Sequence, residues 1–297
     1  MNARSRSDTH PGALRSDSGM VSEFHYRVAW RSHSAVPGHH SSTQFGGGFE
    51  FHGHAPLIAY PDPRSLDIRA SLNEPFGQFV VRTFRQRSAI AVHVIADLSA
   101  SMGFRGACNK YEILTRFSVC AAHSAFRTGD SFGFIGCGES IRQELLIPLR
   151  RYKGIAQDLS QRLKSHFPED RSALGLLESP ALLGRKKSLV FLASDFYFPL
   201  AILKRLLQAL DRHDVVPVVL QDSREEWLPA RGLMRLKDCE SGRSRLLILR
   251  PGMRAKIQAD FAKRRDALIQ LCTQFGRAPH FVTDAFDPDR LTRYFLQ

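Results

Sequence analysis

The stretch AIAVHVIADLSASM (Ala89–Met102) decides the fold of this chain. Its first eight residues form a near-continuous apolar run of strand length, and a second run of this kind follows at 188–193. Such runs are typical of strands that are buried on both faces, as in a parallel sheet covered by helices. The sequence therefore predicts an α/β protein built on a buried sheet.

Helical and strand patterns alternate after this first strand. Asn109 and Glu112 have the spacing of a capping box, so we expect a helix to begin there. The other expected elements are strands at 130–137, 215–220, 245–249 and 280–283, and helices at 153–163, from 199, at 254–275 and from 288. This alternation predicts a doubly wound, mostly parallel sheet flanked by helices over residues 86–297.

Two segments precede this domain. Residues 1–20 lack hydrophobic periodicity and are interpreted as a disordered tail. Residues 21–85 are irregular and β-rich, and we expect this lead-in segment to pack on the edge of the sheet. Seven of the twelve histidines precede residue 55, but their spacing matches no metal-ligand template, so we interpret them as scattered loop residues.

The chain is basic, with 42 Lys and Arg against 29 Asp and Glu, and a formal net charge of +13. This balance favours an acidic partner: a nucleic acid, an anionic membrane or an acidic protein surface. The basic segment 223–265 lacks interleaved aromatic residues, so no nucleic-acid partner is expected, although a nucleic-acid-associated structural module stays open as an alternative. Arg185, Lys186 and Lys187 are interpreted as a solvated edge.

The cellular location is predicted from absences in the sequence. No secretory signal and no apolar run long enough to span a bilayer are found, so we expect a cytoplasmic protein without a membrane span. The cysteines are widely spaced and odd in number, which favours reduced thiols, three of them in the core. They are Cys108, Cys120, Cys137, Cys239 and Cys272.

Oxygen-bearing side chains gather where the first buried strand ends. Asp97, Ser99 and Ser101 are spaced two residues apart, so a loop leaving the strand can turn all three toward one point. A carboxylate and two hydroxyls are hard ligands that suit Mg²⁺ or Mn²⁺. Asp195 follows the second buried strand and could accept a hydrogen bond from a metal-bound water.

This Asp-x-Ser-x-Ser-Met motif resembles the metal-ion-dependent adhesion site (MIDAS) of von Willebrand factor A domains. The resemblance implies two further positions, an Asp after a later strand and a Thr in a middle loop. Asp195 matches the first, whereas the loop at 166–173 offers only Ser172 for the second. Asp170 in the same loop is interpreted as a surface charge.

The lead-in segment carries a second resemblance. Residues 48–51 (GFEF), 61–72 (PDPRSLDIRASL) and 81–84 (VRTF) resemble the lead-in of bacterial MoxR-associated A-domain proteins. The pairing of Asp-Pro-Arg with Asp-Ile-Arg-Ala is similar to the branch of that family that accompanies methanol oxidation.

The resemblance implies a non-enzymatic protein that acts with a MoxR-type AAA+ ATPase in maturing or activating a client complex. In the branch that accompanies methanol oxidation, this client role is methanol dehydrogenase assembly and calcium insertion. It also implies that an acidic client supplies a carboxylate to the open position of the metal.

Catalytic motifs are not found in the sequence. A haloacid-dehalogenase-like phosphatase needs Asp-x-Asp at the strand end, and the second position here is Ser99. A nucleophile elbow, a phosphate-binding lysine loop, a zinc-binding helix motif and a dinucleotide fingerprint are missing too. We therefore expect no enzyme. An A-domain with a degenerate, metal-free site stays open as an alternative.

Overall fold

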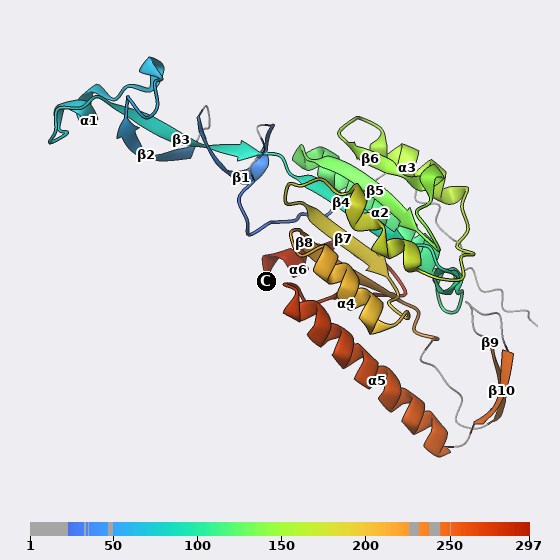
Figure 1. Cartoon of the computed structure of the whole chain (residues 1–297). Coiled ribbons are helices and arrows are strands. Elements are labelled where there is room, and N and C mark those ends of the chain that lie inside the picture. Colours follow the sequence, from blue (N-terminus) through green and yellow to red (C-terminus); the bar gives the residue numbers. More distant parts are fainter. Residues whose placement is uncertain are drawn as a thin grey trace, which may run out of the picture.

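A six-stranded sheet forms the centre of the protein in the computed structural model, which describes residues 23–32, 34, 36–46, 50–225, 232–237, 244–249 and 251–297 (Figure 1). In spatial order the strands are β11 (His280–Thr283), β8 (Asp214–Gln221), β7 (Leu189–Ser194), β4 (Ala91–Asp97), β5 (Ser131–Cys137) and β6 (Ile147–Arg150). All neighbours pair in parallel except β6, which is antiparallel to β5. The predicted tail 1–20 and Cys239 lie outside the described residues.

The two apolar runs of the sequence form the middle of this sheet. Every residue of β7 is buried, and in β4 only Ala91 is partly exposed. Strands of this kind carry helices on both faces, because both faces are apolar. The prediction of a doubly wound, mostly parallel sheet is confirmed.

Helices cover both faces of the sheet. The helices of the central domain are α2 (Lys110–Thr128), α3 (Ile155–Lys164), α4 (Leu200–Ala209), α5 (Pro251–Gln274) and α6 (Pro288–Leu296). Residues of α2, α3 and α6 share one core cluster, whereas those of α4 and α5 share the other. The side chain of Asn109 accepts the N–H of Glu112, which confirms the predicted start of α2.

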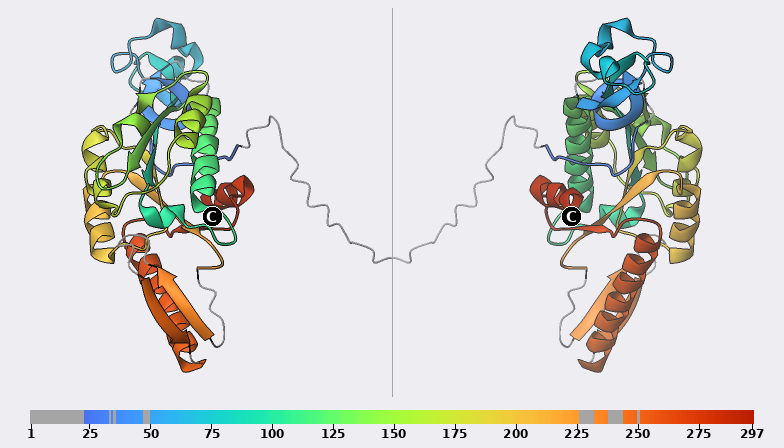
Figure 2. Two further views of the ribbon diagram at one scale, coloured as in Figure 1. Left: turned by 90° about the vertical axis from the view of Figure 1, so that its right-hand side faces the viewer. Right: turned by 90° about the vertical axis from the view of Figure 1, so that its left-hand side faces the viewer.

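The lead-in segment contributes both core residues and a separate sheet. Phe24 is buried, stacks on Phe117 at 6.5 Å between ring centroids and meets Phe191 edge-on. Beyond this extended stretch, β1 (Pro37–Gly46), β2 (Glu50–Pro56) and β3 (Val80–Ser88) form an antiparallel sheet with the short helix α1 (Ile68–Leu72). This sheet projects from the central domain as an arm, and β3 leads directly into β4 (Figures 1 and 2).

Two strands differ from the sequence prediction. Residues 245–249 were expected to join the alternating α/β pattern, but β10 (Ser244–Leu249) pairs only with β9 (Gly232–Lys237) in a two-stranded sheet beside the far end of α5 (Figure 1). Strand β6 was not predicted, because its four residues are mostly exposed and include Pro148. Edge strands lack the double-sided burial that makes a central strand visible in sequence.

Three of the four cysteines that the structure describes lie in the core, as the sequence predicts. Cys120, Cys137 and Cys272 are buried free thiols, and Cys108 is a partly buried one. Among the described residues, no helix combines the length and the apolar character needed to cross a bilayer.

Candidate metal centre

The candidate site lies at the carboxyl ends of β4 and β7, which are neighbours in the sheet. Asp97 is the last residue of β4, and Ser194 is the last residue of β7, directly before Asp195. Open α/β sheets place ligands at this edge, because the loops that leave parallel strands meet there. The loops that follow β4 and β7 therefore bring the predicted residues to one place.

Asp97 is completely buried and is held by two hydrogen bonds. Its Oδ1 accepts the backbone N–H of Ser99 at 2.9 Å, and its Oδ2 accepts the hydroxyl of Ser194 at 2.6 Å. Burial, together with the nearby carboxylate of Asp195, raises the pKa of Asp97 to about 6. Within the described residues no basic side chain forms an ion pair with Asp97, so its negative charge is uncompensated.

The serines of the motif lie beside this carboxylate. Ser99 is 1 % exposed and precedes a 3₁₀ turn at Ala100–Gly103, which brings its hydroxyl to 3.2 Å from that of Ser101. Each hydroxyl oxygen carries two acceptor lone pairs. The structure thus brings together four of the five predicted residues: Asp97, Ser99 and Ser101, with the carboxylate of Asp195 nearby.

Asp195 belongs to a charged network that the sequence analysis missed. The ammonium group of Lys110 donates to Asp195 Oδ2 at 2.7 Å and to Glu225 Oε1 at 2.6 Å. Lys110 is fully buried, and its Nζ lies 5.4 Å from the ring centroid of Tyr197. Burial acts to lower the pKa of Lys110, but the two carboxylates outweigh it and raise the pKa above its usual value.

Glu225 completes this network from the turn that follows β8. Burial raises the pKa of Glu225, and the ammonium group of Lys110 opposes that rise. The site therefore holds three carboxylates, those of Asp97, Asp195 and Glu225, against one ammonium group. Its local charge is negative although the chain as a whole is strongly basic.

The loop expected to carry the fourth ligand packs against the motif through its backbone. The N–H of Ala100 donates to the carbonyl of Asp170 at 2.7 Å. The prediction that Asp170 is a surface charge was wrong, because it is 8 % exposed and its carboxylate is bound by Arg142. For Ser172 no hydrogen bond is found within the part of the chain that the structure describes, so its role as a ligand stays a prediction.

The donor set fits a divalent cation at Asp97, Ser99 and Ser101. A carboxylate offers about four lone-pair positions, and the two hydrogen bonds to Asp97 use only part of this capacity. Burying an unpaired carboxylate is costly, and a bound cation would remove that cost. Asp195 is less free, because Lys110 already occupies its Oδ2.

One sequence signal could have revealed Lys110. It is the first residue of α2, where a positive charge faces the positive end of the helix dipole. A lysine at such a position, directly after a capping Asn109, needs carboxylates nearby to be stabilised. Glu225 offers no comparable signal, since it lies in an irregular loop 115 residues further along the chain.

A second group of potential ligands lies in the neighbouring loops. Cys108, Asp222 and Asp284 have ligand atoms within 4.8 Å of one another. Asp222, however, accepts the backbone N–H groups of Gly106, Ala107 and Cys108 at 2.9–3.0 Å. These hydrogen bonds explain its position: Asp222 fixes the loop that leads into α2 and thereby helps to place Lys110.

Comparison with protein families identifies one family for this chain. A family model described as "Protein of unknown function DUF58" matches residues 64–267. No curated protein matches the chain significantly.

Several solved structures are similar to the chain. BatB from Bacteroides thetaiotaomicron is 10 % identical (70 % of this chain, 100 % of that one, TM-score 0.44). An aerotolerance-related membrane protein from Bacteroides fragilis is 12 % identical; the match covers 70 % of this chain and 98 % of that one, with a TM-score of 0.41. The SpRpn10 VWA domain is 11 % identical; the match covers 69 % of this chain and 93 % of that one, with a TM-score of 0.39. The order and direction of the six strands define the central domain as a doubly wound, mostly parallel α/β domain.

Proposed function

The chain belongs to the DUF58 family of proteins of unknown function, and from this premise we propose that it is a non-enzymatic, metal-dependent protein-interaction module. The observation that carries the proposal is the buried, unpaired carboxylate of Asp97 beside the hydroxyls of Ser99 and Ser101. These three groups would hold Mg²⁺ or Mn²⁺, with Asp195 accepting from a metal-bound water.

The metal would supply an electrophilic position for an incoming carboxylate. Neutral hydroxyl ligands from Ser99 and Ser101 leave much of the positive charge uncompensated, which favours an acidic partner group. The chain's own contribution is to orient these oxygens: Ser194 and the N–H of Ser99 fix the carboxylate of Asp97 from two sides. The net charge of +13 would steer an acidic client toward the protein.

The proposed partners are a MoxR-type AAA+ ATPase and an acidic client protein. The sequence resemblance of the lead-in segment to MoxR-associated A-domain proteins supports this assignment. Its similarity to the MxaS branch supports a client role in methanol dehydrogenase assembly and calcium insertion. In this scheme the chain couples the ATPase to the client and does no chemistry itself.

A second candidate function is favoured by Lys110. Its ammonium group forms ion pairs with both Asp195 and Glu225 and so supplies positive charge to these carboxylates. An interaction module with a metal-free site, in which this ion-pair network alone shapes the binding surface, is therefore the alternative.

Thermal unfolding with chelator and then with rising Mg²⁺ or Mn²⁺ distinguishes the two candidates. A ligand of the folded state alone stabilises it by about 2.7 kcal/mol at one hundred times its Kd. We expect this rise for the wild type and for the matched control Asp211→Asn, whose carboxylate is exposed, and none for Asp97→Asn. If metal stabilises none of the three proteins, the metal-free alternative holds.

The partner is tested separately by co-purification of the ATPase. We expect wild type and Asp211→Asn to retain the ATPase in the presence of Mg²⁺, and Asp97→Asn to lose it. Equal retention by all three proteins would contradict a metal-dependent contact.

A further inference from the structure

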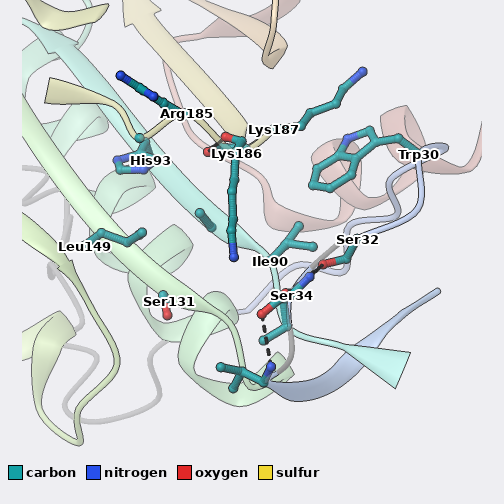
Figure 3. Close-up of a pocket in the computed structure, with 15 residues that line it drawn as sticks. Trp30, Ser32, Ser34, Ile90, His93, Ser131, Leu149, Arg185, Lys186 and Lys187 are labelled. Carbon is teal, nitrogen blue, oxygen red and sulfur yellow. Dashed lines mark hydrogen bonds between the residues drawn. The ribbon is translucent and has the colours of Figure 1, made fainter. Parts of the chain in front are cut away.

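A cavity of about 480 Å³ opens at the edge of the central sheet opposite to Asp97 (Figure 3). It lies where β4, β5 and β7 begin, whereas the candidate metal centre lies where β4 and β7 end. Its volume falls in the range typical of sites for small molecules, roughly 300–1,000 Å³. The residues that line the cavity include Trp30, Ile90, His93, Leu149 and Lys186.

The mouth of the cavity carries three consecutive cations, Arg185, Lys186 and Lys187. All three are exposed, and none forms an ion pair with any residue that the structure describes. Figure 3 shows the side chain of Lys186 extending into the cavity between His93 and Ile90. The sequence interpretation of a solvated edge accounts for their exposure but not for the direction of Lys186.

Two carboxylates lie beside the residues that line the cavity, and both have partners of their own. Asp130 accepts the backbone N–H of Ile90 at 2.8 Å and lies 2.9 Å from Nε2 of His40. Asp214 accepts two hydrogen bonds from the guanidinium group of Arg277, at 2.6 and 2.9 Å. It also accepts the indole N–H of Trp30 at 3.2 Å, which fixes the ring at the cavity wall. No carboxylate is among the residues that line the cavity, so the charged side chains of the lining are all positive.

His93 is the buried imidazole in the wall of the cavity. It is 4 % exposed, and its buried Nε2 has no hydrogen-bond partner among the described residues. Burial, with a smaller contribution from nearby His213, lowers the pKa of His93 to about 4. The imidazole is therefore neutral at pH 7 and offers one donor and one acceptor.

Gly133 on the neighbouring strand makes room for this imidazole. A Cβ at position 133 would lie 2.8 Å from Nδ1 of His93, closer than non-bonded atoms approach. A buried polar group without a partner costs about 1–3 kcal/mol, which a ligand could recover. The rest of the wall combines apolar residues, among them Trp30, Ile90 and Leu149, with the serines Ser32, Ser34, Ser131 and Ser188.

We propose that this cavity binds a small organic anion, a carboxylate or phosphate monoester joined to an apolar or aromatic group. Lys186 pairs with the anionic group, the His93 imidazole forms a hydrogen bond with it, and Trp30 and Leu149 contact the apolar group. This site shares no residue with the candidate metal centre, so the two can be tested independently.

Trp30 provides the readout, because the chain has two tryptophans and Trp227→Phe leaves Trp30 as the single emitter. In this background we would titrate phenyl phosphate, benzoate and the neutral benzyl alcohol while recording fluorescence. We expect a saturable change with at least one anion, and binding at least about tenfold weaker with benzyl alcohol. The anion that binds more tightly identifies the preferred charged group.

Two lysine variants localise the binding. Lys186→Gln should raise the Kd about tenfold or more, as expected for a lost charge-assisted hydrogen bond, whereas the exposed Lys204→Gln should leave it unchanged. In the wild type, the ¹⁵N shifts of the His93 imidazole should move with the saturation curve. No saturable change up to about 10 mM of either anion, equal effects of both variants, or equally tight binding of benzyl alcohol would overturn the proposal.

Discussion

The two edges of the central sheet carry charge of opposite sign. At the carboxyl edge, the buried Asp97 and Asp195 and the half-buried Glu225 share a single ammonium group, that of Lys110, which pairs with Asp195 and Glu225. At the amino edge, Lys186 and its neighbours have no ion-pair partner among the described residues. A strongly basic chain thus has a negatively charged site at one edge of the sheet and a positively charged cavity at the other, so the net charge alone predicts neither.

The lysines at the two edges also differ in their contribution to the stability of the fold. Lys110 is completely enclosed and satisfies two carboxylates, whereas Lys186 is exposed and unpaired. Removing one partner of a buried ion pair leaves a charge that nothing compensates, while removing an exposed lysine changes little. The carboxyl edge is therefore part of the folded core, and the amino edge keeps its charge available for a ligand.

The largest expected effect comes from Lys110→Met set against Lys186→Met. The first change leaves Asp195 and Glu225 without their ion-pair partner and should lower the free energy of unfolding by about 3–5 kcal/mol. The second should change it by less than about 0.5 kcal/mol. Urea unfolding of the two variants measures the difference. Similar losses in both would mean that the Lys110 network does not support the fold.

The second prediction concerns the pH dependence of the carboxyl edge in the presence of chelator. The pKa of Asp97 is raised to about 6 in the folded state, so protonation favours folding. Its contribution is fully present below the ordinary carboxyl pKa near 4 and is lost as the pH rises through 6. The wild type should therefore lose about 3 kcal/mol relative to Asp97→Asn between these values.

Urea unfolding at several pH values measures this prediction. Asp211→Asn is the control, since its exposed carboxylate should leave the pH profile of the wild type unchanged. Parallel profiles for wild type and Asp97→Asn would show that the carboxylate is solvated or compensated in the folded protein.

The smallest expected effect lies at the amino edge. Gly133→Ala places a methyl group 2.8 Å from Nδ1 of His93 and should cost about 1–3 kcal/mol through overpacking. It should also weaken anion binding in the cavity, because the imidazole must move. Gly53→Ala is the matched control, since Gly53 is not among the residues that line the cavity and a Cβ there meets nothing within 4 Å. If the two variants have equal free energies of unfolding and equal Kd values for the anion, the imidazole of His93 does not lie against position 133.

The parts of the fold that could be predicted are those whose signal is local. The apolar run of β4, the capping Asn109 of α2 and the apolar face of α4 each lie within a short stretch of sequence. The elements that were missed or misplaced, β6 and β10, are strands outside the middle of the sheet. Their burial depends on which strand lies beside them, which a single segment does not encode.

The same division applies to the candidate site. The arrangement of Asp97, Ser99 and Ser101 follows from a spacing of two residues in one loop, so the sequence alone determined it. The pairing of Asp170 with Arg142 spans 28 residues, and that of Lys110 with Glu225 spans 115. These contacts form only when distant loops pack together.

The sequence by itself determined the buried sheet, its helices and the oxygen-rich turn at the end of β4, because hydrophobic periodicity and local spacing carry that information. Only the tertiary structure decided that a buried lysine neutralises Asp195, that Asp170 is internal, and that His93 lines a cationic cavity. The physical reason is that burial and charge pairing are properties of the packed chain. Each residue's electrostatic environment is set by neighbours that are far away in sequence.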